Sequence, residues 1–145
     1  MPKPPYFPQL YPFSCVPACL RMILAAFDFE ISEAQLRGLC ECDETGTTPS
    51  NAVKAAVECG FDSYKANLEF EELEKEIARN IFAIVYLRLP VESDYSNHAV
   101  VVYKISNNKV FALDPAEIGE REFDKNSFVE FWSRGLTIIV EKKAQ

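Results

Sequence analysis

The residue of this 145-residue chain that is best placed for covalent chemistry is Cys15. It begins a segment in which apolar residues recur at helical spacing, so we place it in the first turn of a helix. Unpaired backbone N–H groups and the positive end of the helix dipole lie there, and this field favours a thiolate, the nucleophilic form of the side chain. The alternative is a buried and inert cysteine, which is the commoner role of this residue type.

A cysteine nucleophile needs a base, a group that orients the base, and donors for the developing oxyanion. The base would have to be His98, because the sequence contains one histidine. His98 stands at the start of a predicted strand, and the next predicted strand ends in Asp114. A carboxylate there could hold the imidazole in the required tautomer, as the third member of a catalytic triad does. Taken singly, His98 could also be a surface or capping residue, and Asp114 could belong to an Asp-Pro turn.

The two strands form a predicted hairpin, and its register decides whether His98 and Asp114 can meet. We place the tip of the hairpin at Asn107-Asn108. With a loop of two or four residues, Asp114 pairs with Val101 and faces away from His98, because side chains alternate along a strand. If the register shifts by one residue, Asp114 comes to the face of His98 and within side-chain reach. The triad hypothesis therefore predicts an odd loop or a bulge in this hairpin.

Gln9, six residues before Cys15, is a candidate oxyanion donor. Its side-chain amide could act beside the backbone N–H of Cys15. A lone glutamine in a loop carries almost no weight, so this role depends on the other candidates.

The other cysteines are interpreted as structural. Cys19 lies one helical turn after Cys15 on the apolar side of the helix, where it fits a small core residue. Cys40, Cys42 and Cys59 could contribute to a zinc site with a further thiol, but a Cys-x-Cys spacing is not a usual zinc knuckle. We interpret these three as free thiols near a loop and expect neither a metal nor another cofactor.

Taken together, the candidate residues resemble the papain-like cysteine peptidases, and most of all the Peptidase C39 family. This family supplies the bacteriocin-processing domains of peptide-exporting ABC transporters. The Gln-x5-Cys spacing and the order Gln, Cys, His, Asp are the specific part of a similarity that covers nearly the whole chain. The residues that carry it are Gln9, the run Cys15-Val16-Pro17-Ala18-Cys19-Leu20, His98 followed by Ala-Val-Val-Val-Tyr, Asp114-Pro115, Gly46-Thr47 and Gly60-Phe61.

By position, the resemblance implies that Cys15 is the nucleophile and His98 the general base and acid. It implies that Asp114 orients the imidazole and that Gln9 is the oxyanion donor. It also implies an α+β, papain-like fold in which N-terminal helices pack against an antiparallel β-sheet, with the active site in the cleft between them. The order of the predicted elements, helices first and strands second, agrees with an α+β fold.

The chain departs from the family pattern at two places. Val16 stands where the family usually has a glycine, and its side chain could crowd the cleft or pack on the helix. Members linked to transporters continue into a membrane domain and an ATPase, whereas this sequence stops at Gln145. We therefore expect a free-standing, single peptidase domain over residues 1–145.

The elements that must position these residues follow from the sequence patterns. Five of the nine prolines lie in residues 1–14, which predicts an extended arm. Ser14 is a candidate N-cap of the first helix, and Ser32 with Gln35 forms a candidate capping box for the second. We expect helices over 15–27, 33–39, 48–60, 69–79 and 127–133, and strands over 61–67, 81–89, 99–105, 110–113 and 136–141.

Composition excludes several classes of protein. The net charge of −7 comes from 22 acidic and 15 basic residues, and no cluster of Lys and Arg offers a nucleic-acid surface. The longest apolar stretches are too short to cross a bilayer, and no signal-peptide core precedes them. An odd number of cysteines excludes a complete set of intrachain disulfides, so we expect a reducing cytoplasm.

The leading hypothesis from the sequence is a cytoplasmic cysteine peptidase. It would cleave peptide bonds in a peptide or protein substrate, with leader peptides among the expected substrates and a separate transporter or other protein as a candidate partner. One alternative is a peptide-binding module of the same fold with weak or no turnover. A papain-like acyl transferase would use the same residues.

Overall fold

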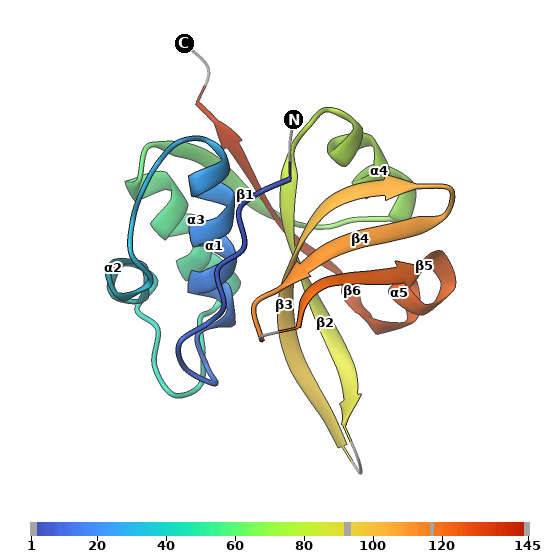
Figure 1. Ribbon diagram of the computed structural model, residues 1–145, viewed down its shortest axis with the longest axis horizontal. Helices are drawn as coiled ribbons and strands as arrows, with labels where there is room; N and C mark the ends of the chain where they lie inside the picture. Colours follow the sequence, from blue (N-terminus) through green and yellow to red (C-terminus); the bar gives the residue numbers. More distant parts are fainter. Residues whose placement is uncertain (1–2, 92–93, 117, 144–145) are drawn as a thin grey trace.

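The β-branched second half of the chain forms most of a single twisted sheet, with helices on both of its faces (Figure 1). The computed structural model describes residues 3–91, 94–116 and 118–143. All paired strands are antiparallel, and their order is β1-β6-β2-β3-β4-β5. The elements are α1 (Cys15–Ala26), α2 (Glu33–Leu39), α3 (Pro49–Glu58), β1 (Phe61–Asn67), α4 (Phe70–Ala78), β2 (Phe82–Val91), β3 (Asp94–Ser106), β4 (Lys109–Asp114), β5 (Gly119–Asp124), α5 (Lys125–Phe131) and β6 (Trp132–Lys142).

Side-chain alternation along the strands divides the core in two. On β3, Ala99 and Val101 pack into the cluster formed with α1, α2 and α3, whereas Val100 and Val102 pack into the cluster with α4 and α5. Continuous apolar strands are expected where both faces of a sheet are covered. The β-sheet therefore serves as the central layer to which the helix carrying Cys15 is fixed.

Helix α1 confirms the predicted apolar face, since Leu20, Ile23 and Leu24 are fully buried. The prediction that the Ser14 side chain caps this helix is wrong. Ser14 is the residue at the N-cap position, but its hydroxyl makes no cap hydrogen bond and contacts other groups instead. With 12 residues, α1 is the longest helix described, and no helix in the described ranges has the length and apolarity that a membrane crossing needs.

The hairpin between β3 and β4 contains the predicted bulge. Its loop is the two-residue pair Asn107-Asn108, and both residues have positive φ angles, 52° and 60°, as a tight hairpin turn requires. The register then shifts between Val102 and Lys104, so that Val101 pairs with Leu113. Asp114 consequently shares a face with His98, as the triad hypothesis requires.

One strand was not predicted. Strand β5 consists mostly of charged residues, and of its six residues only Phe123 is buried. It lies at the edge of the sheet, where a strand needs little apolar surface, so its sequence lacks the β-branched pattern of the inner strands. The capping box of Ser32 and Gln35 is present as predicted.

Candidate active site

Cys15 is the first residue of α1 and is partly buried. The extended arm before Cys15, residues 3–14, passes the end of β4 on its way to α1. There the backbone N–H of Gln9 donates to the carbonyl of Pro115 at 2.7 Å, and the Tyr6 hydroxyl donates to the carbonyl of Asp114 at 2.7 Å. The arm therefore connects the residue before the helix to the strand that carries Asp114.

His98 lies within β3 and joins the two layers. Its Nε2 atom is 2.5 Å from Oδ1 of Asp114, and the thiol of Cys15 is near enough to raise the pKa of the imidazole. A carboxylate accepts, so Nε2 carries the hydrogen in this pair. Because Asp114 occupies Nε2, the nitrogen left for the sulfur is Nδ1. The structure thus brings together Cys15, His98 and Asp114, three of the four predicted site residues.

The surroundings of His98 favour its charged form. Burial disfavours a charge and lowers the pKa, but hydrogen bonds to Asp114 and Cys15 and the charges of both partners raise it. The balance raises the pKa of His98 from 6.5 to about 9. An imidazolium is therefore available as a proton donor at neutral pH.

Asp114 is fully buried and is surrounded by donors. Besides His98, the backbone N–H of Ala116 donates to Oδ1 at 2.9 Å, and Nη1 of Arg121 donates to Oδ2 at 3.0 Å. Burial raises the pKa of this carboxyl, but the contact with His98 and these further donors outweigh it, so the pKa is lowered. Asp114 therefore remains a carboxylate.

Arg121 is a residue that the sequence did not single out. It projects from β5 two residues beyond Gly119, the partner of Asp114 across the β4–β5 ladder. The alternation Gly119, Arg121, Phe123 would have placed Arg121 on the side of Asp114, but this depended on recognising an edge strand with a polar sequence.

Gln9 presents a different arrangement from that expected of a free oxyanion donor. Its Nε2 donates to the carbonyl of Tyr11 at 2.8 Å and to that of Pro12 at 3.2 Å, so both amide hydrogens have acceptors. The Oε1 atom is buried and has no hydrogen-bond partner. A donor role for Gln9 therefore requires that the amide release the longer contact, to Pro12, when substrate binds.

Comparison with known proteins places this chain in a family. Residues 3–145 match the Peptidase C39 family. The chain belongs to this family. Over 133 residues it is 30% identical to the lactococcin-G-processing and transport ATP-binding protein LagD of Lactococcus lactis subsp. lactis, a match of 90% of this chain and 18% of LagD. An uncharacterized protein of Methanothermobacter marburgensis is 28% identical over 131 residues, which are 90% of this chain and 84% of that protein.

Two solved structures show the same fold. The peptidase domain of Streptococcus ComA, a bi-functional ABC transporter involved in a quorum sensing pathway, superposes with a TM-score of 0.81 at 26% identity, covering 94% of this chain and 97% of that chain. A double glycine motif protease from an AMS/PCAT transporter, in complex with the leader peptide, gives a TM-score of 0.84 at 25% identity, covering 97% of this chain and 93% of that chain. The predicted α+β, papain-like fold of the C39 peptidases is confirmed.

The structure also decides between the two expectations for Val16 in this C39 chain. Val16 is 3% exposed and belongs to the cluster beneath α1. Its side chain packs into the core, which removes the reason to expect a crowded cleft.

Two of the remaining cysteines of this C39 chain, Cys19 and Cys40, lie in the core. Cys19 is fully buried, and its thiol donates to the carbonyl of Ala99 at 3.5 Å. Burial raises the pKa of the Cys40 thiol to about 12. Within the described part of the chain, no group of three or more Cys, His, Asp and Glu residues is arranged to hold a metal ion.

Proposed function

We propose that this chain is a cysteine peptidase that hydrolyses peptide bonds with Cys15 as nucleophile. The observation that carries the proposal is the position of His98, whose Nε2 contacts the carboxylate of Asp114 while the thiol of Cys15 lies near enough to influence the same imidazole. A nucleophile, its base and an orienting carboxylate in contact are the parts that acyl transfer requires.

The reaction would proceed in two stages. As the base, His98 already holds the proton given up by the thiol, and the thiolate attacks the carbonyl carbon of the scissile bond, forming a C–S bond and an oxyanion. The imidazolium then gives its proton to the leaving amine as the C–N bond breaks, which leaves a thioester on Cys15. His98 next takes a proton from water, whose oxygen attacks the thioester and displaces the thiolate.

Asp114 and Gln9 would assist at defined steps of this reaction. Asp114 holds Nε2, so the nitrogen facing the sulfur is available first as acceptor and then as donor. The backbone N–H of Cys15 and the amide of Gln9 would donate to the oxyanion once the Gln9 amide has turned from Pro12.

The substrate class that the relatives support is a peptide with a leader segment. A solved neighbour is a double glycine motif protease bound to its leader peptide, and LagD combines processing with transport. We propose cleavage after a Gly-Gly pair, by a single C39-like domain in the cytoplasm, with a peptide exporter as candidate partner.

Selective alkylation tests the nucleophile without knowledge of the substrate. With substoichiometric iodoacetamide near neutral pH, we expect label on Cys15 in preference to Cys42 and Cys59, which are also partly exposed and serve as internal controls. The preference should disappear in His98→Ala. Equal labelling of the exposed thiols would overturn the proposal.

Hydrolysis is tested with a synthetic leader peptide that contains Gly-Gly before its cleavage site, against the same peptide with Val-Val. We expect cleavage of the first alone, and a loss of about 10³-fold or more in Cys15→Ala. Binding without cleavage would indicate a peptide-binding module. A product joined to an added amine in place of water would indicate an acyl transferase.

A further inference from the structure

Glu33, the first residue of α2, is a buried carboxylate that the proposed reaction does not use. Its side chain is 1% exposed. Burial of a carboxylate is costly unless hydrogen bonds and an opposite charge compensate it. The contacts of Glu33 therefore show which groups compensate its burial and which segments of the chain it joins.

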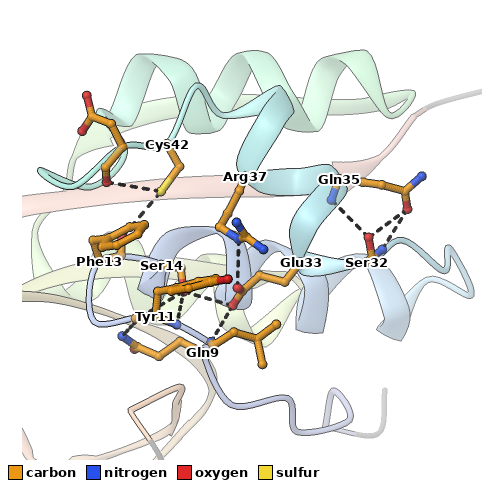
Figure 2. A network of polar contacts seen from close by, with 11 residues as sticks. Gln9, Tyr11, Phe13, Ser14, Ser32, Glu33, Gln35, Arg37 and Cys42 are labelled. Atoms are coloured by element: carbon orange, nitrogen blue, oxygen red, sulfur yellow. Dashed lines mark hydrogen bonds and ion pairs between the residues drawn. The ribbon is translucent and has the colours of Figure 1, made fainter.

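The two oxygens of Glu33 serve different partners (Figure 2). Oε1 accepts from the backbone N–H of Leu10 at 3.0 Å and is 3.1 Å from the hydroxyl of Ser14. Oε2 accepts from Nε of Arg37 at 3.2 Å. Leu10 directly follows Gln9, and Ser14 directly precedes Cys15. One carboxylate oxygen thus holds both ends of the stretch that separates the candidate oxyanion donor from the nucleophile.

The stretch itself is closed by hydrogen bonds of its own. The backbone N–H of Ser14 donates to the carbonyl of Tyr11 at 3.1 Å, and the N–H of Tyr11 donates back to the Ser14 hydroxyl at 3.0 Å. The carbonyl of Tyr11 also accepts from the amide of Gln9. The Ser14 hydroxyl is therefore committed to this turn and to Glu33, which explains why it does not cap α1.

Arg37 supports the same turn from outside. Its guanidinium lies 4.5 Å from the centre of the Tyr11 ring, while its Nε balances the charge of Glu33. The side chain of Arg37 is 25% exposed, so water can also satisfy it. Ser14 is fully buried, so its hydroxyl, unlike Arg37, has no solvent alternative to its contact with Glu33.

We propose that Glu33 is a positioning residue for peptide cleavage. It holds the turn at residues 10–14 against α2, and so fixes where Gln9 and Cys15 lie relative to each other. This inference rests on the proposed function, because the spacing of Gln9 and Cys15 matters only if both act on one carbonyl. Small displacements of such groups can lower the rate by about 100-fold.

Two substitutions separate the acceptor from the charge. Glu33→Gln removes the charge but retains an oxygen that can accept from Leu10 and Ser14. The NH2 group of the new amide would face Arg37, whose side chain can move into solvent. Glu33→Ala removes the acceptor shared by the Leu10 N–H and the buried Ser14 hydroxyl, and so frees residues 10–14 from α2. Leu73→Ala is the matched destabilised control, because Leu73 is fully buried on the other face of the sheet.

The readout is steady-state cleavage of the Gly-Gly leader peptide, at a temperature where all variants are folded by circular dichroism. We expect Glu33→Ala to lower kcat by about 10- to 100-fold with KM changed less than about twofold. Glu33→Gln should restore kcat to within about threefold of wild type, and Leu73→Ala should keep it. An unchanged kcat in Glu33→Ala, or an equal loss in Glu33→Gln or in Leu73→Ala, would overturn the proposal.

Failure of the proposed function gives a different result. If the wild-type chain cleaves no peptide, the alkylation rate of Cys15 decides instead, because it reports the position of the thiol beside His98. Glu33→Ala should slow alkylation by about fivefold or more and Glu33→Gln should not. The same rate in Glu33→Ala as in wild type would then reject a positioning role.

Discussion

His98 depends on its two partners for its charge, and each has a distinct effect on the reaction. Asp114 supplies a buried negative charge from within the sheet, whereas Cys15 approaches from the helical layer. Arg121 and the Ala116 N–H keep Asp114 ionised, so that it does not take the proton from the imidazole. The charge state of the site is therefore set by residues of β3, β4 and β5 as much as by the cysteine.

The raised pKa of His98 predicts the basic limb of the pH profile. Because the imidazolium must protonate the leaving amine, kcat/KM should fall as the pH rises through about 9. In Asp114→Asn the charge that raises the pKa is lost while burial still lowers it, so the limb should move to lower pH. The exposed Asp62 of β1 gives the matched control, and Asp62→Asn should leave the limb in place. If the basic limb of Asp114→Asn stayed at the pH of the wild-type limb, this would contradict the assignment of the limb to His98.

The same pKa has a consequence for stability. A histidine whose folded-state pKa lies above its ordinary 6.5 stabilises the fold fully below that pH, and the contribution is lost as the pH rises through about 9. Thermal unfolding followed from pH 6 to 10 should show this loss in wild type, and a smaller loss in Asp114→Asn.

At the scale of elements, the hairpin of β3 and β4 shows what a sequence can predict about a site. The pattern of β-branched residues located both strands, and the asparagine pair located the turn. The register stayed open, because a shift of one residue reverses every side chain and both choices keep valines in the core. Only the chemistry expected of His98 and Asp114 favoured a bulge, and the structure has one.

Glu33 and Arg121 were beyond such reasoning for a physical reason. Each is charged and stands in a segment whose pattern is polar, so the sequence alone suggests an exposed side chain. Their burial or pairing arises when distant segments meet: the arm closes over Glu33, and β5 adds to the edge beside Asp114. Cys15 and His98 could be singled out as candidates because helix position and residue count mark them locally.

Two glycines provide a matched test of how an element is held in place. Gly135 in β6 has a φ of 67°, and a Cβ there would lie 2.1 Å from the carbonyl oxygen of Leu68, which is backbone and cannot move aside. Gly135→Ala should lower the free energy of unfolding by about 2–3 kcal/mol. Gly38, inside α2, has nothing within 4 Å of the same atom. Gly38→Ala should raise stability by about 0.5–1 kcal/mol.

Chemical denaturation of both variants measures the difference. A loss in Gly38→Ala as large as that in Gly135→Ala would mean that the close approach of β6 to Leu68 is not what constrains this segment.

At the scale of the whole molecule, the site is divided between two layers. Cys15 comes from the helical layer and His98 and Asp114 from the sheet, so catalytic geometry depends on how α1 is packed on β3 (Figure 1). The second core, under α4 and α5, stabilises the sheet but contains none of the contacts between α1 and β3. Stability and activity should therefore respond differently to damage in the two cores.

Leu20→Ala and Leu73→Ala test this division with the same chemical change. Both leucines are fully buried, Leu20 between α1 and the sheet and Leu73 on α4 against the opposite face. Each substitution should lower the free energy of unfolding by about 2–5 kcal/mol. With kcat measured on the folded fraction, Leu20→Ala should also lose activity, since α1 can shift into the cavity and take Cys15 away from His98. Equal kcat values in the two variants would show that the helical layer holds the nucleophile without help from this core.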